Sequence, residues 1–211
     1  MRMWGTVFRY FGGVQVDMDF GLDYDKLFLG LIRWLLPLTV CLLAEGVWME
    51  RRSRMELLVR FRYGTDKRWW RVKFLRGFRF GMTVGAILFC IALAADGLSP
   101  AGISQETGSV FLLWLLHFAT MLSLFMASAL MGLKGPAPGA LLLLEGVSFL
   151  TGILSGRLSI WMYGRWGMYF QSAWFDRKTG VPVFVAFASE GFLVAVSYGA
   201  GRIFLKWGGG K

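Results

Sequence analysis

Residues 49–79 read MERRSRMELLVRFRYGTDKRWWRVKFLRGFR, and they carry most of the positive charge of the chain. This segment holds eleven Lys and Arg residues against three acids, an excess of eight in a chain whose formal net charge is +10. Apolar stretches long enough to cross a bilayer flank it on both sides. Because short loops rich in Lys and Arg beside membrane spans face the cytoplasm, we expect residues 50–79 to be cytoplasmic.

The composition is typical of a polytopic membrane protein. Of the 211 residues, 56% are apolar, and the mean hydropathy is +0.54. The 28 glycines fit this class, because Gly is more frequent in transmembrane helices than in soluble ones. A net charge of +10 is compatible with nucleic-acid binding in general. Here the charge is concentrated in one short segment between spans, so we predict the lipid bilayer as a partner and no nucleic acid.

Five apolar segments are predicted to form transmembrane helices, since a span needs roughly 20 apolar residues. They are Leu27–Met49, Phe80–Asp96, Val110–Leu133, Ala137–Ser155 and Val181–Leu205. The expected fold class is therefore an all-α polytopic membrane protein with five transmembrane helices, or six if a re-entrant element is counted.

The basic segment also predicts the topology of the other segments. With residues 50–79 in the cytoplasm, residues 1–26 form an extracytoplasmic N-terminal segment, and residues 27–211 form one transmembrane domain whose C-terminus is cytoplasmic. Residues 156–180 then lie outside. They are rich in aromatic residues and interrupted by Gly164 and Gly167, which predicts an external or re-entrant element.

Within the basic segment, the first helix is expected to continue beyond the membrane to about Tyr63. Two acid-before-base pairs at a spacing of four residues favour this extension. They are Glu50/Arg54 and Glu56/Arg60. Gly64 is a good residue to end the helix.

A second helix is predicted over Asp66–Gly77, capped by Thr65. Trp69, Trp70 and Phe74 lie among its cations, a pattern typical of a helix that rests on lipid headgroups. The expected helix–turn–helix is either a docking site for a cytoplasmic protein or a plain loop held to anionic lipid.

The run RFRYGTDKRWW at 60–70 resembles the cytoplasmic segment of small permease subunits of type-2 ABC transporters, including a bacterial group linked to lantibiotic export or immunity. That group has an Arg-Tyr-Gly-Ser-like turn followed by basic residues and a Trp pair, and Thr65 stands here in place of the Ser. The runs FGG at 11–13 and WLL at 34–36 also look similar. Beyond residues 8–77 the resemblance is one of layout only.

The resemblance implies a bacterial plasma-membrane permease subunit that moves an amphipathic or peptide substrate, for export or self-immunity. A separate ATPase subunit would bind ATP and Mg²⁺ and dock on the turn, a second permease subunit would complete the transporter, and this chain itself would hold no cofactor. In the family's six-helix fold, the first span of this chain corresponds to the second helix, so a first helix is missing here. The implied docking residues are Arg60, Phe61, Arg62, Tyr63, Gly64, Thr65, Lys67, Arg68, Trp69 and Trp70.

Three ionisable residues fall inside the predicted spans: His117, Glu145 and Glu190. Such groups are costly in a bilayer and mark functional sites by default. They form either a polar track for substrate or protons, or neutral carboxyls that bond to a neighbouring helix. Glu45 lies nearer the cytoplasmic end and is expected to pair with the basic segment.

Glycines repeat at a spacing of four residues at 77, 81 and 85, and again at 152 and 156. This spacing lets helices approach closely. It predicts tight helix packing, either within the chain or between subunits.

Enzyme motifs are absent from the sequence. The chain has no Walker A loop, no HExxH and no Cys/His cluster, so we predict that it is not an ATPase and has no catalytic or metal-binding residues. An alternative function is an integral membrane immunity or scaffold protein that acts by binding alone. A membrane-embedded enzyme is a third possibility, and it predicts that Glu145, Glu190 and His117 converge on one cavity.

Overall fold

The computed structural model describes residues 5–16, 23–53, 62–63, 65–98, 103–133, 135–154 and 160–208. Five helices in this part of the chain are long and apolar enough to cross a membrane. They are α2 (Tyr24–Ser53), α4 (Asp66–Gly97), α5 (Thr107–Leu130), α6 (Ala137–Leu154) and α7 (Val183–Gly208). Each of the five predicted spans is thus a helix of sufficient length and hydrophobicity, which is the pattern of a helical multi-pass membrane protein.

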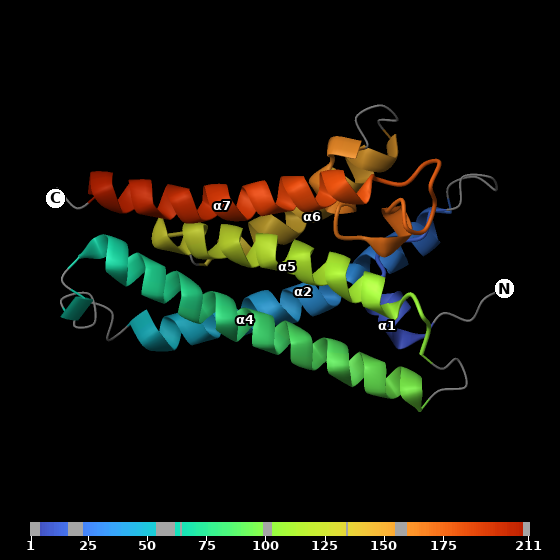
Figure 1. Ribbon diagram of the computed structural model, residues 1–211, viewed down its shortest axis with the longest axis horizontal. Helices are drawn as coiled ribbons and strands as arrows, with labels where there is room; N and C mark the ends of the chain where they lie inside the picture. Colours follow the sequence, from blue (N-terminus) through green and yellow to red (C-terminus); the bar gives the residue numbers. More distant parts are fainter. Residues whose placement is uncertain are drawn as a thin grey trace.

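Helix α5 is the core of the bundle. It contacts the other four long helices, and Figure 1 shows α4 and α7 running along opposite sides of it. Buried residues make up 72% of the apolar window of α5, against 17–39% in the other four spans. Because α5 is apolar almost all round, it can be enclosed by neighbours, whereas the others keep one face for lipid.

The glycines of α4 form the seam with α5. A Cβ atom at Gly77 or Gly81 would meet α5 side chains at 2.5–2.6 Å, closer than a real contact permits, and one at Gly85 would make a tight contact at 3.0 Å. The α5 side chains concerned are Met126, Leu122 and Trp114. The predicted close packing is therefore found within one chain.

Helix α4 corrects the prediction of a separate headgroup helix over Asp66–Gly77. It is one continuous helix of 32 residues, which spans about 48 Å at 1.5 Å per residue. Gly77 does not break the helix, because it is buried against α5. The Trp69, Trp70 and Phe74 side chains are buried in the bundle; the indole N–H of Trp70 donates to the Tyr198 carbonyl of α7 at 3.1 Å.

The predicted cap of α4 is confirmed. The hydroxyl of Thr65 accepts a hydrogen bond from the Arg68 backbone N–H at 3.4 Å. Thr65 itself is in an extended conformation, as an N-cap residue normally is. The helix therefore starts where the local sequence specifies.

The N-terminal segment is folded into the bundle at the opposite end. The short helix α1 (Thr6–Phe11) buries Val7, Phe8 and Phe11 and contacts α2, α4 and α5. Asp96, near the end of α4, accepts hydrogen bonds from the Thr6 and Val7 backbone N–H groups, the second at 2.8 Å. A carboxylate is favourable there because the first N–H groups of a helix have no partner within it.

The segment between α6 and α7 also folds onto this end of the bundle (Figure 1). It contains two short 3₁₀ helices, η2 (Tyr163–Arg165) and η3 (Tyr169–Gln171), and residues 164–172 are buried. The Gln171 side-chain amide donates to the Val14 carbonyl at 2.7 Å, and Arg165 Nε donates to Gln171 Oε1 at 3.0 Å. These contacts join the segment to the N-terminal residues.

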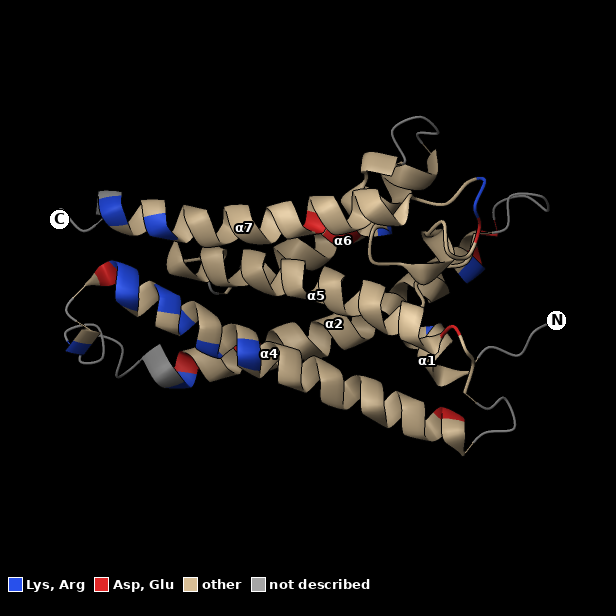
Figure 2. Ribbon diagram, in the orientation of Figure 1, with Lys and Arg blue, Asp and Glu red and all other residues tan. Residues whose placement is uncertain are grey.

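Charge is distributed unevenly between the two ends of the molecule. Figure 2 shows Lys and Arg gathered on the first half of α4 and on the last turns of α7. We refer to this end, which carries the exposed cations Arg62, Lys67, Arg68, Arg71 and Arg202, as the basic end. The end with α1, η2 and η3 is the α1 end.

Candidate functional site: a buried carboxylate–imidazole–carboxylate cluster

The three ionisable residues predicted in the spans meet at one place. His117 of α5 lies between Glu145 of α6 and Glu190 of α7. Its Nδ1 is 2.7 Å from Glu190 Oε1, and its Nε2 is 3.1 Å from Glu145 Oε2. At most 1% of any of these side chains is exposed. We refer to these three residues as the acid–His cluster.

Each member comes from a different helix. α6 packs on α2, α5 and η2, whereas α7 packs on α4 and α5. His117 therefore links α6 and α7, two helices that both pack on α5. The three side chains converge, as the alternative of a membrane-embedded enzyme predicted, and they are buried against one another in the interior.

Two aromatic residues complete the site, and neither was predicted from the sequence as a site residue. The indole N–H of Trp34 on α2 donates to Glu145 Oε1 at 3.0 Å. The ring of Tyr163 on η2 lies 4.7 Å from that of His117, centre to centre. The phenol oxygen of Tyr163 has no hydrogen-bond partner among the described residues. From the sequence alone, both residues are indistinguishable from ordinary packing or interfacial aromatics.

Two glycines let the η2–η3 segment cover the cluster. A Cβ atom on Gly167 would collide with the His117 side chain, and one on Gly164 would collide with the backbone of α6 at Glu145. These are the same two glycines that interrupt the aromatic segment in the sequence. Because these two residues have no side chain, the η2–η3 segment can lie directly against His117 and α6.

The geometry determines the charge of the imidazole. Both ring nitrogens face a carboxylate oxygen at 3.1 Å or less, although the Nε2 contact lacks hydrogen-bond alignment. A neutral imidazole has a lone pair on one nitrogen, and that lone pair would point at a carboxylate oxygen. His117 is therefore protonated on both nitrogens whenever the two carboxyl groups are ionised.

The environment favours protonated groups in this site. Burial, together with the charges of Glu145 and Glu190, raises the pKa of the Tyr163 phenol well above its ordinary value. The phenol therefore keeps its proton and remains a possible hydrogen-bond donor. A cluster of this kind can store or pass a proton, since it combines an imidazole with two carboxyl groups.

The arrangement does not suit chelation of a single metal ion. The two carboxyl groups lie at opposite nitrogens of the ring, so one ion cannot bind both carboxylates and a ring nitrogen at normal ligand distances. Within the described ranges, no group of three or more His, Cys, Asp or Glu side chains has a metal-binding arrangement.

The predicted docking residues have different surroundings. Arg62, Thr65, Lys67 and Arg68 are exposed, and Tyr63 is half-buried. Trp69 and Trp70 are buried against their own chain, so the prediction that they form part of an open docking surface is wrong. The remaining three predicted docking residues, Arg60, Phe61 and Gly64, lie outside the described residues.

The predicted pairing of Glu45 with the basic segment is also wrong. Glu45 is fully buried, and neither carboxyl oxygen has a hydrogen-bond partner within the described part of the chain. It lies next to Gly77 of α4. Its side chain turns into the seam between α2 and α4 and not toward the basic end.

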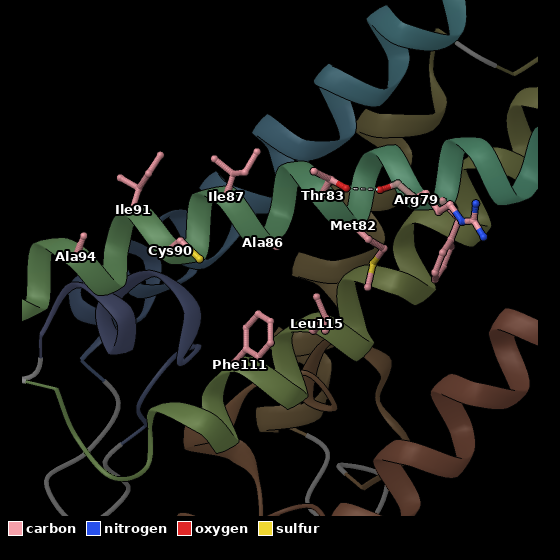
Figure 3. A pocket seen from close by; sticks show the side chains of 11 residues that line it. Arg79, Met82, Thr83, Ala86, Ile87, Cys90, Ile91, Ala94, Phe111 and Leu115 are labelled. Atoms are coloured by element: carbon pink, nitrogen blue, oxygen red, sulfur yellow. Dashed lines mark hydrogen bonds between the residues drawn. The ribbon is translucent and has the colours of Figure 1, made fainter.

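Figure 3 shows an apolar groove between α4 and α5 on the outside of the bundle. Met82 and Cys90 of α4 face Phe111 and Leu115 of α5 across it. A groove of this composition suits lipid chains or another apolar helix. It is separate from the acid–His cluster, since none of the three cluster residues lines it.

Comparisons with protein-family models, with curated proteins and with solved structures found no match. The functional argument therefore rests on the residues and contacts of this chain.

Proposed function

We propose that this protein is the membrane-spanning permease subunit of an ATP-driven transporter of the ABC type, which moves an amphipathic or peptide substrate. A separate ATPase subunit binds the basic end and supplies the energy. The observation that carries this proposal is the continuity of α4, which extends from the exposed cations at Lys67 and Arg68 to Asp96 at the α1 end.

The exposed surface of the basic end is chemically suited to a protein partner. Arg62, Lys67, Arg68 and Arg71 present cationic side chains around the capped start of α4. Charged side chains on a surface guide and orient an acidic partner more than they add affinity. The docking surface of this proposal consists of these four cations and Thr65.

The buried residues behind this surface are suited to transmitting force. Trp70 is bonded to the Tyr198 carbonyl of α7, and its ring fills the space left by Gly201. A push on the start of α4 therefore acts on α7 as well. At its far end α4 holds α1 through the carboxylate of Asp96. Close packing in the α4–α5 seam favours movement of α4 as a rigid body.

Charge reversal at the basic end tests the proposal. The double variant Arg62→Glu/Arg68→Glu should lose co-purification of an ATP-hydrolysing subunit from the native membrane and should lose the stimulated ATPase activity. The matched control is Arg177→Glu/Lys178→Glu, which makes the same charge change on exposed cations at the α1 end. Cysteine-accessibility labelling checks that both variants keep the wild-type topology.

Equal recovery of the ATPase with both double variants would contradict this docking surface. Recovery of no ATPase with the wild type would favour the alternative, an immunity or scaffold protein that acts by binding alone. Loss of binding to anionic vesicles, with ATPase recovery intact, would assign the cations to lipid contact.

A further inference from the structure

When all three of its groups are ionised, the acid–His cluster carries a net negative charge in the interior of the protein. An imidazolium and two ionised carboxylates sum to −1, and the three side chains are buried inside a membrane-spanning bundle. A net charge in such a place is expensive. The cluster becomes neutral when one of the two carboxyl groups takes up a proton.

The hydrogen bonds do not distinguish the two carboxyl groups. Each has one oxygen in a hydrogen bond: Oε1 of Glu145 accepts from the Trp34 indole N–H, and Oε1 of Glu190 lies 2.7 Å from His117 Nδ1. The Oε2 atom of each is buried without a hydrogen-bond partner among the described residues. The added proton is therefore assigned to the pair of carboxyl groups and not to one of them.

We propose that the acid–His cluster is a proton-binding site in which the pair Glu145 and Glu190 takes up and releases one proton and controls the attachment of α7 to α5 and α6. With the proton bound, the cluster is neutral and His117 holds both helices. Loss of the proton restores the charge of −1 and loosens α7 at the α1 end. This inference is independent of the proposed ATPase docking, because it concerns a different site.

The titratable neighbours of Glu190 within the described part of the chain come from three elements. α5 contributes His117, α6 contributes Glu145 and η2 contributes Tyr163, while Trp34 of α2 has no titratable group. The phenol oxygen of Tyr163 is also buried without a hydrogen-bond partner among the described residues.

Infrared spectroscopy of the purified full chain in nanodiscs tests the assignment of the proton. The Glu45→Gln background removes another buried carboxyl group, which would contribute a similar band because neither of its oxygens has a hydrogen-bond partner among the described residues. In that background at neutral pH, we expect a protonated carboxyl band that shifts in D₂O. Adding either Glu190→Gln or Glu145→Gln should abolish the band, because each variant leaves one carboxylate balanced by the imidazolium of His117.

A distance measurement tests the control of α7. Leu144 of α6 and Phe192 of α7 are exposed positions for spin labels, after replacement of the exposed Cys90. The distance between the labels should increase as the band disappears with rising pH. In Glu190→Gln, which imitates the protonated form, the distance should stay at the short value at every pH.

Three results would overturn the proposal. One is the absence of a protonated carboxyl band in the background protein. Another is a band that survives Glu190→Gln. The third is a label distance that does not follow the band, or that follows Na⁺ or K⁺ concentration at constant pH, since a bound cation would then balance the charge. If Glu190→Gln fails to fold, Glu190→Asp should keep the band and shift its midpoint.

Discussion

The basic end and the acid–His cluster both consist of ionisable side chains, but in opposite settings. At the basic end, cations such as Lys67 and Arg68 are exposed. In the cluster, His117 has a carboxylate at each ring nitrogen, and the site is closed by a glycine contact. Exposed charges interact weakly and can be rearranged, whereas buried charges must be compensated one by one. The basic end therefore suits a reversible partner, and the cluster suits a switch inside the bundle.

The largest effect is expected for His117→Ala. It leaves two buried carboxyl groups facing an empty space, so the free energy of unfolding should fall by about 3–5 kcal/mol, as for other buried ion pairs that lose one partner. The measurement is reversible unfolding in mixed micelles. Glu145→Gln/Glu190→Gln added to His117→Ala should restore much of the loss, because no charge is then left unpaired. A triple variant as unstable as His117→Ala would show that packing, and not charge, dominates the site.

The variants Trp70→Ala and Arg71→Ala compare a buried and an exposed position that are neighbours in the basic end. Trp70 is fully buried and lies against α7 at Tyr198 and Gly201. Its truncation should cost about 3 kcal/mol, since large aromatic deletions leave a cavity. The matched control is Arg71→Ala on the exposed side of the same helix turn, which should change stability very little. Similar losses for the two variants would mean that the helix does not pack as described.

The sequence predicts much of the fold, because the length and hydrophobicity of a segment decide whether it spans a membrane. It also identifies the cap at Thr65 and the three cluster residues, since ionisable groups inside spans are rare. It does not predict that Trp70 is buried. Aromatic residues among cations have the same pattern on a headgroup helix and on a helix that meets a neighbour, and only the space beside Gly201 distinguishes the two. The sequence also did not predict Trp34 and Tyr163 as site residues, because an aromatic residue beside a buried polar group has the same sequence pattern as one in ordinary packing.

A smaller effect is expected for Gly167→Ala, which tests how closely the cluster is covered. The added methyl group would collide with His117, and overpacking of this kind costs roughly 1–3 kcal/mol. The control is Gly191→Ala on α7, where a Cβ atom meets nothing within 4 Å and the variant should gain helix propensity. Unfolding in mixed micelles should therefore move in opposite directions for the two variants. Equal shifts would contradict the close approach at Gly167.

Asp96→Asn extends the comparison to the α1 end, where one carboxylate caps α1. The amide keeps one oxygen as acceptor and loses the negative charge that favours a helix N-terminus. Stability should decrease by about 1 kcal/mol, within the range seen for N-cap changes. Hydrogen exchange should show faster exchange at residues 6–11, with α5 unaffected. Unchanged exchange in α1 would mean that its side-chain packing alone holds the helix.

The smallest effect on stability is expected for Arg68→Ala. Its guanidinium group is exposed, and substitutions of this kind usually stay within about 0.5 kcal/mol of the wild type. If the proposed function holds, the same variant should weaken recovery of the ATPase, so that stability and binding separate at this residue. For His117→Ala the order is reversed, with a large loss of stability and no direct effect on the docking surface. A large loss of stability for Arg68→Ala would show that the basic end is built like the cluster, and the distinction between a surface for a partner and a buried switch would then fail.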